Sequence, residues 1–340
     1  MRILVTGGAG FIGSHVIKKL LQNKENVVFN LDKMGYASST YMLDKLINEN
    51  SSISSNQYKF LNIDLSSKPE TEKAIEEARP NLIMHLAAES HVDRSIDGPE
   101  EFIKSNIVGT FNLLESARKF WSRLNSDEKD NFRFHHISTD EVFGSLGDSG
   151  SFSEETPYDP RSPYSASKAA SDHLVNTWHH TFGIPITISN CSNNFGPYQF
   201  PDKLIPLCIE KCLNQEKIPL YGDGKNIRDW LFVEDHIDAL LLIISKGEIG
   251  KSYCIGGSEE KRNIEIITKI CNLMDKYYPQ NKPHARLINY VKDRPGHDRR
   301  YSIDSTFLNK SLGWKPKYCF EESLEKTLKW YIDRKKGHSF

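Results

Sequence analysis

The sequence "TGGAGFIG" at residues 6–13 separates a short apolar run, residues 3–5, from a segment of helical character, residues 12–22. Its glycines fit two overlapping patterns, G-x-G-x-x-G and G-x-x-G-x-x-G, through Gly7, Gly8, Gly10 and Gly13. Such glycines permit a tight turn, let the backbone approach a pyrophosphate, and leave a helix N-terminus facing the phosphate charge. The stretch therefore predicts a strand, a turn and a helix that bind a dinucleotide.

A carboxylate lies where the second strand of this unit is expected to end. Residues 27–29 form an apolar run, and Asp32 comes nineteen residues after Gly13. A carboxylate there can accept hydrogen bonds from the adenosine ribose and would repel a 2′-phosphate, so NAD is favoured over NADP. Lys33 is the one observation that favours NADP, because a basic neighbour accompanies NADP in some proteins.

Apolar runs alternate with helical segments through the first half of the chain. The expected strands are residues 3–5, 27–29, 59–61, 82–84, 134–137 and 184–188, and the expected helices are 12–22, 70–77, 99–120 and 164–182. This alternation predicts an α/β fold, a doubly wound, mostly parallel sheet of the Rossmann type with helices on both faces. Ligands of such sheets bind at the carboxyl ends of the strands.

After about residue 190 the pattern loosens. Prolines interrupt it, and helical segments return at residues 233–245, 263–276 and 321–334. We expect an NAD-binding domain over 1–190 with a later contribution from about 227–250, and a smaller, interleaved substrate lobe over most of 191–340. Residues 48–56 and 146–153 are predicted to be polar loops.

Composition excludes several classes of protein. The chain has 340 residues, of which 38% are hydrophobic and 26% charged, with a net charge of −1. We therefore expect neither a nucleic-acid surface nor a membrane partner, and the glycine-broken N-terminus is a poor signal peptide. Six scattered cysteines include a pair four apart, Cys208 and Cys212, but no ligand spacing surrounds them. Buried, reduced thiols in a cytoplasmic protein without a metal are the better interpretation.

Tyr164 and Lys168 follow Pro163 at the start of a predicted helix. Residues four apart share one helical face. An ammonium group beside a phenol lowers the phenol's pKa from its usual value of about 10, because it stabilises the phenolate. The pair is thus suited to remove a hydroxyl proton while a hydride leaves the same carbon for NAD, and the lysine can also bind the nicotinamide ribose. An ordinary surface pair is the alternative.

Two adjacent acids, Asp140 and Glu141, lie just beyond the apolar run at residues 134–137, within "STDEVFG" (138–144). Charges beside a core are costly unless they are paired or used. The pair is either a solvated strand end or a proton-transfer site.

Taken together, the glycine loop and the Tyr-x-x-x-Lys motif resemble those of the extended short-chain dehydrogenase/reductases that act on nucleotide sugars. Longer motifs narrow the resemblance to the dTDP-glucose 4,6-dehydratases and run essentially from end to end. They are "LAAESHVDRSI" (86–96), "STDEVFG" (138–144), "SNNFGPYQFPDKLIP" (192–206), "IRDWLFVEDH" (227–236) and "DRPGHDRRYSID" (293–304).

The resemblance implies a role for each acid. Tyr164 would remove the C4 hydroxyl proton, Glu141 would abstract the C5 proton as general base, and Asp140 would protonate the departing C6 hydroxyl. Thr139 would bind the C4 oxygen, and the NAD would be regenerated within the site. Adjacency supports opposite protonation states for the two acids, since two like charges so close do not both ionise easily.

The resemblance also implies binding residues. For the cofactor these are Gly7, Gly10, Phe11, Ile12, Gly13, Asp32, Lys33, Met34, Gly35, Asp64, Leu65, Leu86, Ala87, Ala88, Ser90, Ser105, Tyr164, Lys168 and Asn194. For the nucleotide sugar they are Ser90, Thr139, Asn193, Lys203, Leu204, Pro219, Tyr221, Arg228, Glu259, Arg294 and His297. Arg228 suits the pyrophosphate by its charge and planar geometry.

The chain departs from the family pattern at a few places. Phe143 and Gln199 replace a usual Tyr and His, and Glu259 stands where an Asn often contacts the phosphates. Because a carboxylate would repel phosphate, the loop or the nucleotide is expected to sit differently there. These changes leave the choice between thymine and uracil open.

Three alternatives remain beside the dTDP-glucose 4,6-dehydratase. They are a dehydratase acting on UDP-glucose or another nucleotide hexose, a 4-epimerase or UDP-glucuronate decarboxylase, and a non-catalytic NAD-dependent regulator. The acid pair counts against an epimerase, which eliminates nothing, and the retained Tyr and Lys count against a regulator. The resemblance further implies a homodimer, for which the apolar helices at 99–120 and 164–182 are suited, and a place in deoxysugar biosynthesis such as that of rhamnose.

Overall fold

The computed structural model describes residues 1–49, 53, 54 and 56–337. The predicted polar loop at 48–56 falls partly outside the described residues. Contacts divide the chain into two compact units. The first comprises Met1–Val142, Pro160–Asn190 and Ile237–Tyr253, and the second comprises Phe143–Asp159, Cys191–His236 and Cys254–Phe340.

A seven-stranded sheet in the order β10-β6-β5-β4-β1-β2-β3 forms the centre of the first unit, so the predicted mostly parallel α/β fold is confirmed. β1 pairs in parallel with both β2 and β4, which makes it the point where the strand order reverses. The strands are β1 (Arg2–Thr6), β2 (Val27–Asp32), β3 (Tyr58–Asn62), β4 (Leu82–His85), β5 (Arg133–Thr139), β6 (Ile186–Cys191) and β10 (Ser252–Ile255).

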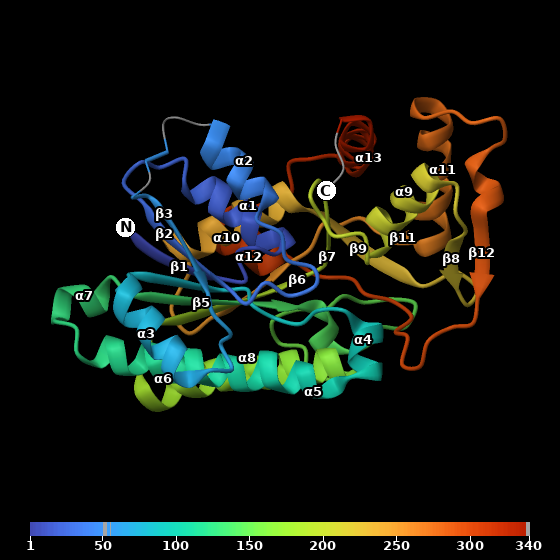
Figure 1. The fold of residues 1–340 in the computed structure, drawn as a ribbon. Helices are drawn as coiled ribbons and strands as arrows, with labels where there is room; N and C mark the ends of the chain where they lie inside the picture. Colours follow the sequence, from blue (N-terminus) through green and yellow to red (C-terminus); the bar gives the residue numbers. More distant parts are fainter. Residues whose placement is uncertain (50–52, 55, 338–340) are drawn as a thin grey trace. The chain divides into compact units, whose positions relative to one another are not determined.

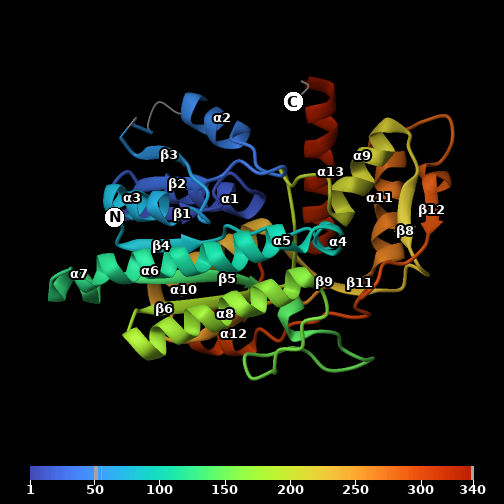
Figure 2. The same cartoon turned by 60° about the horizontal axis from the view of Figure 1, so that its bottom comes forward.

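Helices cover both faces of this sheet (Figure 1). α3 (Lys68–Ala78), α6 (Gly109–Ser122) and α8 (Pro163–Phe182) lie on one face, and α1 (Phe11–Leu20) and α10 (Val233–Lys246) lie on the other. Figure 2 shows α6 and α8 running side by side, and the two helices are in contact. Shorter helices complete the unit, namely α2 (Tyr41–Glu49), α4 (Val92–Asp97), α5 (Pro99–Phe102) and α7 (Ser126–Asp130).

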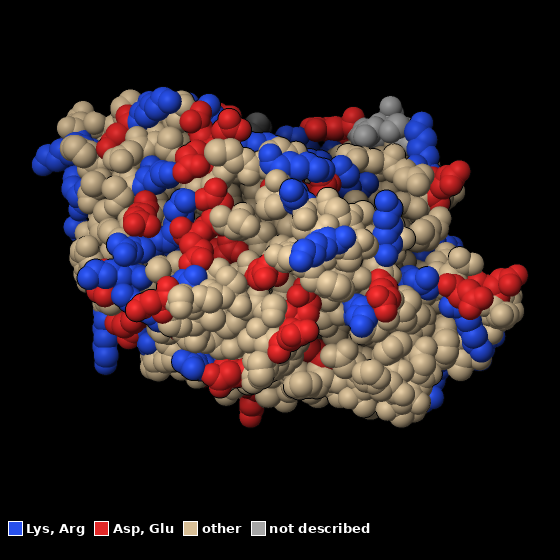
Figure 3. Space-filling model, turned by 180° about the vertical axis from the view of Figure 1, so that it is seen from behind, with Lys and Arg blue, Asp and Glu red and all other residues tan. Residues whose placement is uncertain are grey.

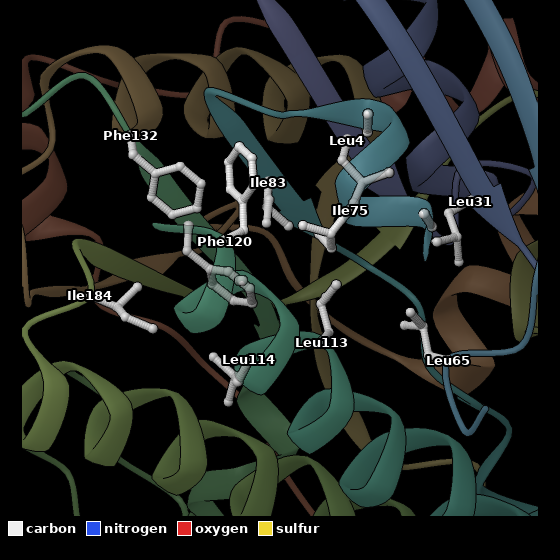
Figure 4. Close-up of a cluster of buried hydrophobic side chains, with 14 of the residues drawn as sticks. Leu4, Leu31, Leu65, Ile75, Ile83, Leu113, Leu114, Phe120, Phe132 and Ile184 are labelled. Carbon is white, nitrogen blue, oxygen red and sulfur yellow. The ribbon is translucent and has the colours of Figure 1, made fainter. Parts of the chain in front are cut away.

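The main hydrophobic core fills the layer between the sheet and α3, α6 and α8 (Figure 4). Strand residues such as Ile83 and Phe134 meet Leu113, Leu114 and Phe120 of α6, and all five are at most 4% exposed. Burying a Leu, Ile or Phe side chain contributes about 1.5–3 kcal/mol. This layer holds β4 and β5 against α8, which matters because β5 and α8 carry predicted site residues and others follow β4 directly.

The prediction of one continuous α-helix over residues 99–120 is wrong in the middle of that range. The chain forms α5, then a π-helix, η1 (Ile103–Val108), and then α6. A π-turn opens the backbone ladder, so some carbonyls accept other donors. Asn106 illustrates this, because its carbonyl accepts hydrogen bonds from the hydroxyls of Thr110 at 2.5 Å and Ser171 at 2.7 Å.

The second unit contains two small sheets, of order β11-β9-β7 and β12-β8. Its strands are β7 (Asn193–Phe195), β8 (Ile218–Tyr221), β9 (Ile227–Phe232), β11 (Glu260–Arg262) and β12 (Ile288–Val291). Its helices are η2 (Asp140–Phe143, shared with the first unit), α9 (Leu204–Asn214), α11 (Asn263–Tyr277), η3 (His284–Leu287), α12 (Thr306–Leu312) and α13 (Phe320–Gly337). Pro206 lies in the first turn of α9, where no intrahelical N–H bond is lost.

Residues 143–159 were predicted within the NAD-binding domain but pack with the second unit. The ring of Phe143 lies 5.3 Å from the rings of both Phe152 and Tyr158. Phe152 in turn pairs by a β-bridge with Ile303, and its N–H donates to the carbonyl of Ser302 at 2.8 Å. The chain therefore leaves the first unit directly after Val142 and returns at Pro160.

Lysines and arginines are interspersed with acids over the face shown in Figure 3, as a net charge of −1 leads one to expect. Among the described residues, no helix is long and apolar enough to cross a membrane. Over the same part of the chain, no group of three or more His, Cys, Asp or Glu side chains is placed to hold a metal ion. None of the six cysteines, all within the described residues, forms a disulfide. Five are buried, whereas Cys319, which was expected to be buried, is exposed.

Candidate active site

The glycine loop forms a tight turn between β1 and α1. Gly7 has a φ of +71°, and a Cβ there would lie 2.7 Å from the backbone of Ala87. A Cβ on Gly13 would lie 2.2 Å from the carbonyl oxygen of Gly7. The N-cap of α1, Gly10, has no side-chain cap. The first amides of the helix are therefore available to an anion.

Asp32 ends β2 beside this loop and is buried at 6% exposure. Its carboxylate accepts hydrogen bonds from the N–H of Ala9 at 3.0 Å, the N–H of Met34 at 2.8 Å and the hydroxyl of Ser38 at 3.0 Å. The acid thus joins the glycine turn to the segment that follows β2. Gly35 lies in that segment and is half-buried, and Met34 is exposed.

Lys33 forms an ion pair with Glu89. Its ammonium lies 2.8 Å from the carboxylate of Glu89. Burial would lower the pKa of Lys33, but the hydrogen bond and charge of Glu89 outweigh burial, and the pKa is raised. Among the charges that act on Lys33 is Asp64, which follows β3 and precedes the buried Leu65. Asp64 accepts a hydrogen bond from the N–H of Ser66 at 2.8 Å.

The segment after β4 lies against the glycine turn. The hydroxyl of Thr6 lies 3.2 Å from the N–H of Ala87 and 2.7 Å from Nδ1 of His85. Further along, the Asn106 amide bonds both backbone groups of Glu89, at 2.8 and 3.0 Å, and the hydroxyl of Ser167 at 2.8 Å. Of the other residues predicted here, Leu86, Ala88 and Ser105 are half-buried and Ser90 is exposed.

Tyr164 and Lys168 lie in the first turns of α8, as the spacing predicted. Ser162 caps the helix in a reciprocal capping box with Ser165, and Pro163 occupies its first position. Tyr164 is 7% exposed and its ring packs edge-on against Phe102. The Lys168 ammonium donates to the carbonyl oxygen of Ile137 on β5 at 2.8 Å. This bond fixes the helix pair beside the end of the strand that carries the two acids.

Thr139 ends β5, and Asp140 and Glu141 open the short helix η2. The Thr139 hydroxyl donates to Oδ1 of Asp140 at 3.3 Å and accepts from the N–H of Glu141 at 3.3 Å. Asp140 is 1% exposed, whereas Glu141 is only partly buried. The two neighbouring acids therefore occupy different surroundings.

Behind these residues lies a buried polar network that the sequence analysis missed. Nε2 of His136 lies 3.0 Å from Oδ1 of Asp172 and 3.5 Å from the Lys168 ammonium. Oδ2 of Asp172 accepts from the hydroxyl of Ser138 at 2.7 Å and from the amide of Asn190 at 3.3 Å. The same amide donates to the carbonyl oxygen of Thr139 at 3.2 Å.

Comparisons with known proteins show the family of the chain. The model of the GDP-mannose 4,6 dehydratase family matches residues 4–327. The dTDP-glucose 4,6-dehydratase of Salmonella typhimurium is 50% identical over 98% of this chain and 93% of its own length. That of Neisseria meningitidis is 50% identical over 98% of this chain and 94% of its own length.

The chain belongs to the dTDP-glucose 4,6-dehydratase family. A crystal structure of the dTDP-glucose 4,6-dehydratase of Streptomyces venezuelae, determined with NAD bound, superposes on this family member with a TM-score of 0.88. It is 37% identical and covers 99% of this chain and 98% of its own. The UDP-glucose 4-epimerase of Thermotoga maritima has a TM-score of 0.83, with 26% identity over 98% of this chain and 99% of its own.

In the second unit of this dehydratase family member, several predicted substrate residues lie together. Arg228 is 6% exposed, its guanidinium lies 4.2 Å from the centre of the Tyr301 ring, and it donates to the carbonyl oxygen of Asp298 at 3.0 Å. Burial and the charges of Arg294 and Arg228 lower the pKa of His297, although Asp293 lies 2.6 Å away. The His297 ring meets the ring of Tyr221 edge-on.

The remaining predicted residues of the second unit are more dispersed along its elements. Asn193 and Asn194 lie on β7, Lys203 is the N-cap of α9 and Leu204 its first residue, and Pro219 lies on β8. Oδ1 of Asn194 accepts a hydrogen bond from Nδ1 of His236 at 2.8 Å, and burial lowers the pKa of that histidine to about 3 and keeps the ring neutral. Glu259 pairs with Lys261 at 2.6 Å.

Proposed function

We propose that the protein dehydrates dTDP-glucose to dTDP-4-keto-6-deoxyglucose. One observation carries the proposal: Asp140 and Glu141 follow β5 immediately, beside the strand carbonyl that holds Lys168. A chain that only oxidised or epimerised a sugar needs the Tyr and Lys but no second acid–base pair. Curated relatives that are about 50% identical bear the name of this dehydratase.

The glycine turn fits a dinucleotide. Gly7 and Gly13 are so closely packed that a Cβ on either would meet backbone atoms, while the N-terminus of α1 has no side-chain cap. Asp32 lies beside the turn to bind ribose hydroxyls. We propose NAD rather than NADP, because the one basic neighbour, Lys33, is paired with Glu89. When bound, NAD supplies the hydride acceptor for C4 and the hydride donor for C6.

Tyr164 and Lys168 act on the C4 hydroxyl in this proposal. The Tyr164 phenolate takes the hydroxyl proton, and the ammonium of Lys168 stabilises that phenolate. The Thr139 hydroxyl binds the C4 oxygen as it becomes a carbonyl. Because the new carbonyl acidifies the C5 hydrogen, the remaining chemistry is a proton removal at C5 and a departure of hydroxide from C6.

The two acids divide that elimination between them. Glu141, which is partly exposed, takes the C5 proton as carboxylate and returns it to C5 when C6 has been reduced. Asp140 is 1% exposed, and burial disfavours a charged carboxylate, so it is suited to hold the proton that leaves with the C6 hydroxyl as water. Tyr164 has then gained one proton and Asp140 has lost one, so a proton must pass from Tyr164 back to Asp140 before the next turnover. With that return the cycle closes, and the sugar loses one water overall.

Arg228, Arg294, His297 and Tyr221 are proposed to bind the nucleotide diphosphate. The buried, stacked guanidinium of Arg228 presents fixed charge to phosphate oxygens. Glu259 was expected to repel phosphate, but its ion pair with Lys261 offsets that charge. The arrangement therefore accommodates a diphosphate, and the preference for thymine over uracil remains part of the proposal.

The decisive experiment uses the purified protein with dTDP-glucose and, separately, UDP-glucose, without added NAD. We expect dTDP-glucose to be converted faster than UDP-glucose. The product should be lighter than the substrate by the mass of one water, with no net accumulation of reduced cofactor. Glu141→Gln should lower the rate of water loss by at least about 10²-fold, while Glu155→Gln, an acid outside the proposed site, should not.

Faster turnover of UDP-glucose would reassign the substrate. Unchanged mass together with a C4 epimer by NMR would replace the dehydratase with an epimerase. Unchanged sugar in every respect, despite bound NAD, would rule out activity on these two sugars and leave a different nucleotide-sugar substrate or the non-catalytic regulator.

We also propose a homodimer formed through α6 and α8. Apolar side chains on this side of the first unit are 37–47% exposed, namely Ile103, Val108, Phe111 and Phe182. Phe111 and Phe182 both stack edge-on against Trp178 and form one continuous apolar surface. Light scattering should report a dimer, and Phe111→Glu should give monomers. The lack of disulfides among the six described cysteines is in keeping with a reducing compartment such as the cytoplasm.

A further inference from the structure

Three residues of α8 share one face at intervals of four: Tyr164, Lys168 and Asp172. Each step advances about 6 Å along the helix, so the three side chains lie in one row. On β5, His136 and Ser138 share one face because side chains alternate along a strand. The two rows meet at Asp172, which is completely buried and contacts His136 and Ser138.

The proton on His136 can be assigned from its partners. Within the described part of the chain, Nδ1 of His136 is buried and has no hydrogen-bond partner, while Nε2 lies 3.0 Å from the Asp172 carboxylate. Burial, and then the charge of Lys168, lower the pKa of His136 to about 4, so the ring is neutral near pH 7. Its single N–H therefore lies on Nε2 and donates to Asp172.

Asp172 remains charged in spite of its burial. Burial alone would raise its pKa, but the hydrogen bond from His136, the charge of Lys168 and the hydroxyl of Ser138 together lower it. Lys168 and Asp172 both lie close to the same ring nitrogen, at 3.5 and 3.0 Å. A buried ammonium and a buried carboxylate thus face each other across a neutral imidazole.

The other ionisable groups around Lys168 and Asp172 do not change the net charge of the pair. From β4, His85 lies 5.1 Å from the His136 ring, and burial lowers its pKa well below its usual range, so it is neutral too. η1 contributes Asn106, which is uncharged and bonds Ser167 and Ser171 of α8. Asp140 opens η2 directly after β5, and Tyr164 lies one turn before Lys168, and both belong to the proposed reaction.

The same carboxylate reaches the acid pair. Asn190 on β6 donates to Asp172 and to the carbonyl oxygen of Thr139. Ser138, which donates to the same carboxylate oxygen of Asp172 as Asn190, directly precedes Thr139. Asp172 therefore holds the backbone from which Asp140 and Glu141 begin, as well as facing the lysine that acts on Tyr164.

We propose that Asp172 is a positioning residue that sets the proton affinity of Tyr164 by partly neutralising Lys168, and that aligns the end of β5 with α8. The proposal rests on the proposed function, in which Tyr164 is the base. With the Asp172 charge present, Lys168 lowers the phenol's proton affinity less than a lone ammonium would.

The test compares Asp172→Asn with Ser138→Ala. Asp172→Asn removes the negative charge, so Tyr164 loses its proton more easily and the acidic limb of the pH profile of kcat/KM moves to lower pH, by about one unit. Ser138→Ala removes a hydrogen bond to the same carboxylate but keeps the charge, so that limb should stay in place. Parallel losses of activity in both variants without a shift would overturn the proposal.

A second measurement does not depend on turnover. Tyrosine labelled with ¹³C at Cζ reports the titration of each phenol, and the Tyr164 resonance is the one absent from Tyr164→Phe. In the NAD-loaded protein its midpoint should be lower in Asp172→Asn than in the unaltered chain or in Ser138→Ala. An unmoved midpoint would refute the role of Asp172 whatever the substrate, whereas a moved midpoint in a protein inactive on dTDP-glucose would refute only the proposed function.

Discussion

Two buried carboxylates, one in each unit, have pKa values shifted in opposite directions. Asp172 in α8 is completely buried, yet its pKa is lowered, because His136, Lys168 and Ser138 outweigh the burial that would raise it. Asp229 on β9 is 1% exposed, and burial raises its pKa to about 6, although the amides of Gly257 and Glu259 donate to it at 3.1 and 2.9 Å.

The difference lies in the neighbouring charges. Where Asp172 has an ammonium nearby, Asp229 has the carboxylate of Glu260, which raises its pKa further. Hydrogen bonds from neutral amides reduce the cost of burying an acid but do not remove it. Of these two acids, the one whose pKa is lowered lies beside the proposed chemistry, and the one whose pKa is raised anchors a loop.

The largest expected effect comes from removing the cation. Lys168→Met leaves Asp172 buried without its counter-charge, and we expect the free energy of unfolding to fall by about 3 kcal/mol. Adding Asp172→Asn to that variant should recover part of the loss, which chemical denaturation will show. Strictly additive effects of the two substitutions would mean that the residues do not interact, and the comparison with Asp229 would lose its explanation.

The next effect is a pH dependence at Asp229. Its folded-state pKa of about 6 lies above the unfolded value of about 3.9, so the folded state binds more protons between these values and loses stability as pH rises through them. The unaltered chain should therefore lose up to about 3 kcal/mol of unfolding free energy relative to Asp229→Asn between pH 4 and 7. Denaturation of both proteins at several pH values measures this, and a constant difference between them would contradict it.

The smallest effect belongs to an exposed acid. Glu72 on α3 lies 2.7 Å from the ammonium of Lys119 on α6, and both side chains are largely solvated. Water screens such a pair, so Glu72→Gln should leave the denaturation midpoint unchanged within error. A loss of stability as large as that of Lys168→Met would show that burial does not explain why charged partners matter more to Asp172 than to Glu72.

Local pattern was enough to predict the frame of the first unit. The glycine turn, Asp32 and the Tyr164–Lys168 spacing each depend on neighbours in sequence, and the structure places all of them as the pattern indicated. The π-helix in the middle of 99–120 was not predicted, because it depends on what the released carbonyl of Asn106 meets in α8. Helix α9 was missed because Pro206 was interpreted as a break.

The buried network escaped prediction for a different reason. His136 and Asp172 are 36 residues apart in sequence, and Asn190 is 18 residues beyond Asp172, so nothing local joins them. One signal was present in the sequence, since Asp172 continues the four-residue spacing of Tyr164 and Lys168. A third charged residue on an otherwise buried face, four residues after a predicted catalytic lysine, needs a partner.

The π-helix η1 also sets how the chain can change in length. Each residue of an α-helix turns the chain by about 100°, so deleting one residue from the middle of α6 would rotate everything beyond the deletion. A π-turn closes its hydrogen bond from i to i+5, one residue more than an α-turn, so deleting one residue from Ile103–Val108 would let the ladder close as regular α-helix. Thr110, Asn112 and Leu113 should then keep their contacts with His85, the carbonyl of Leu65 and the core. η1 should therefore accept the loss of one residue, which α6 itself should not.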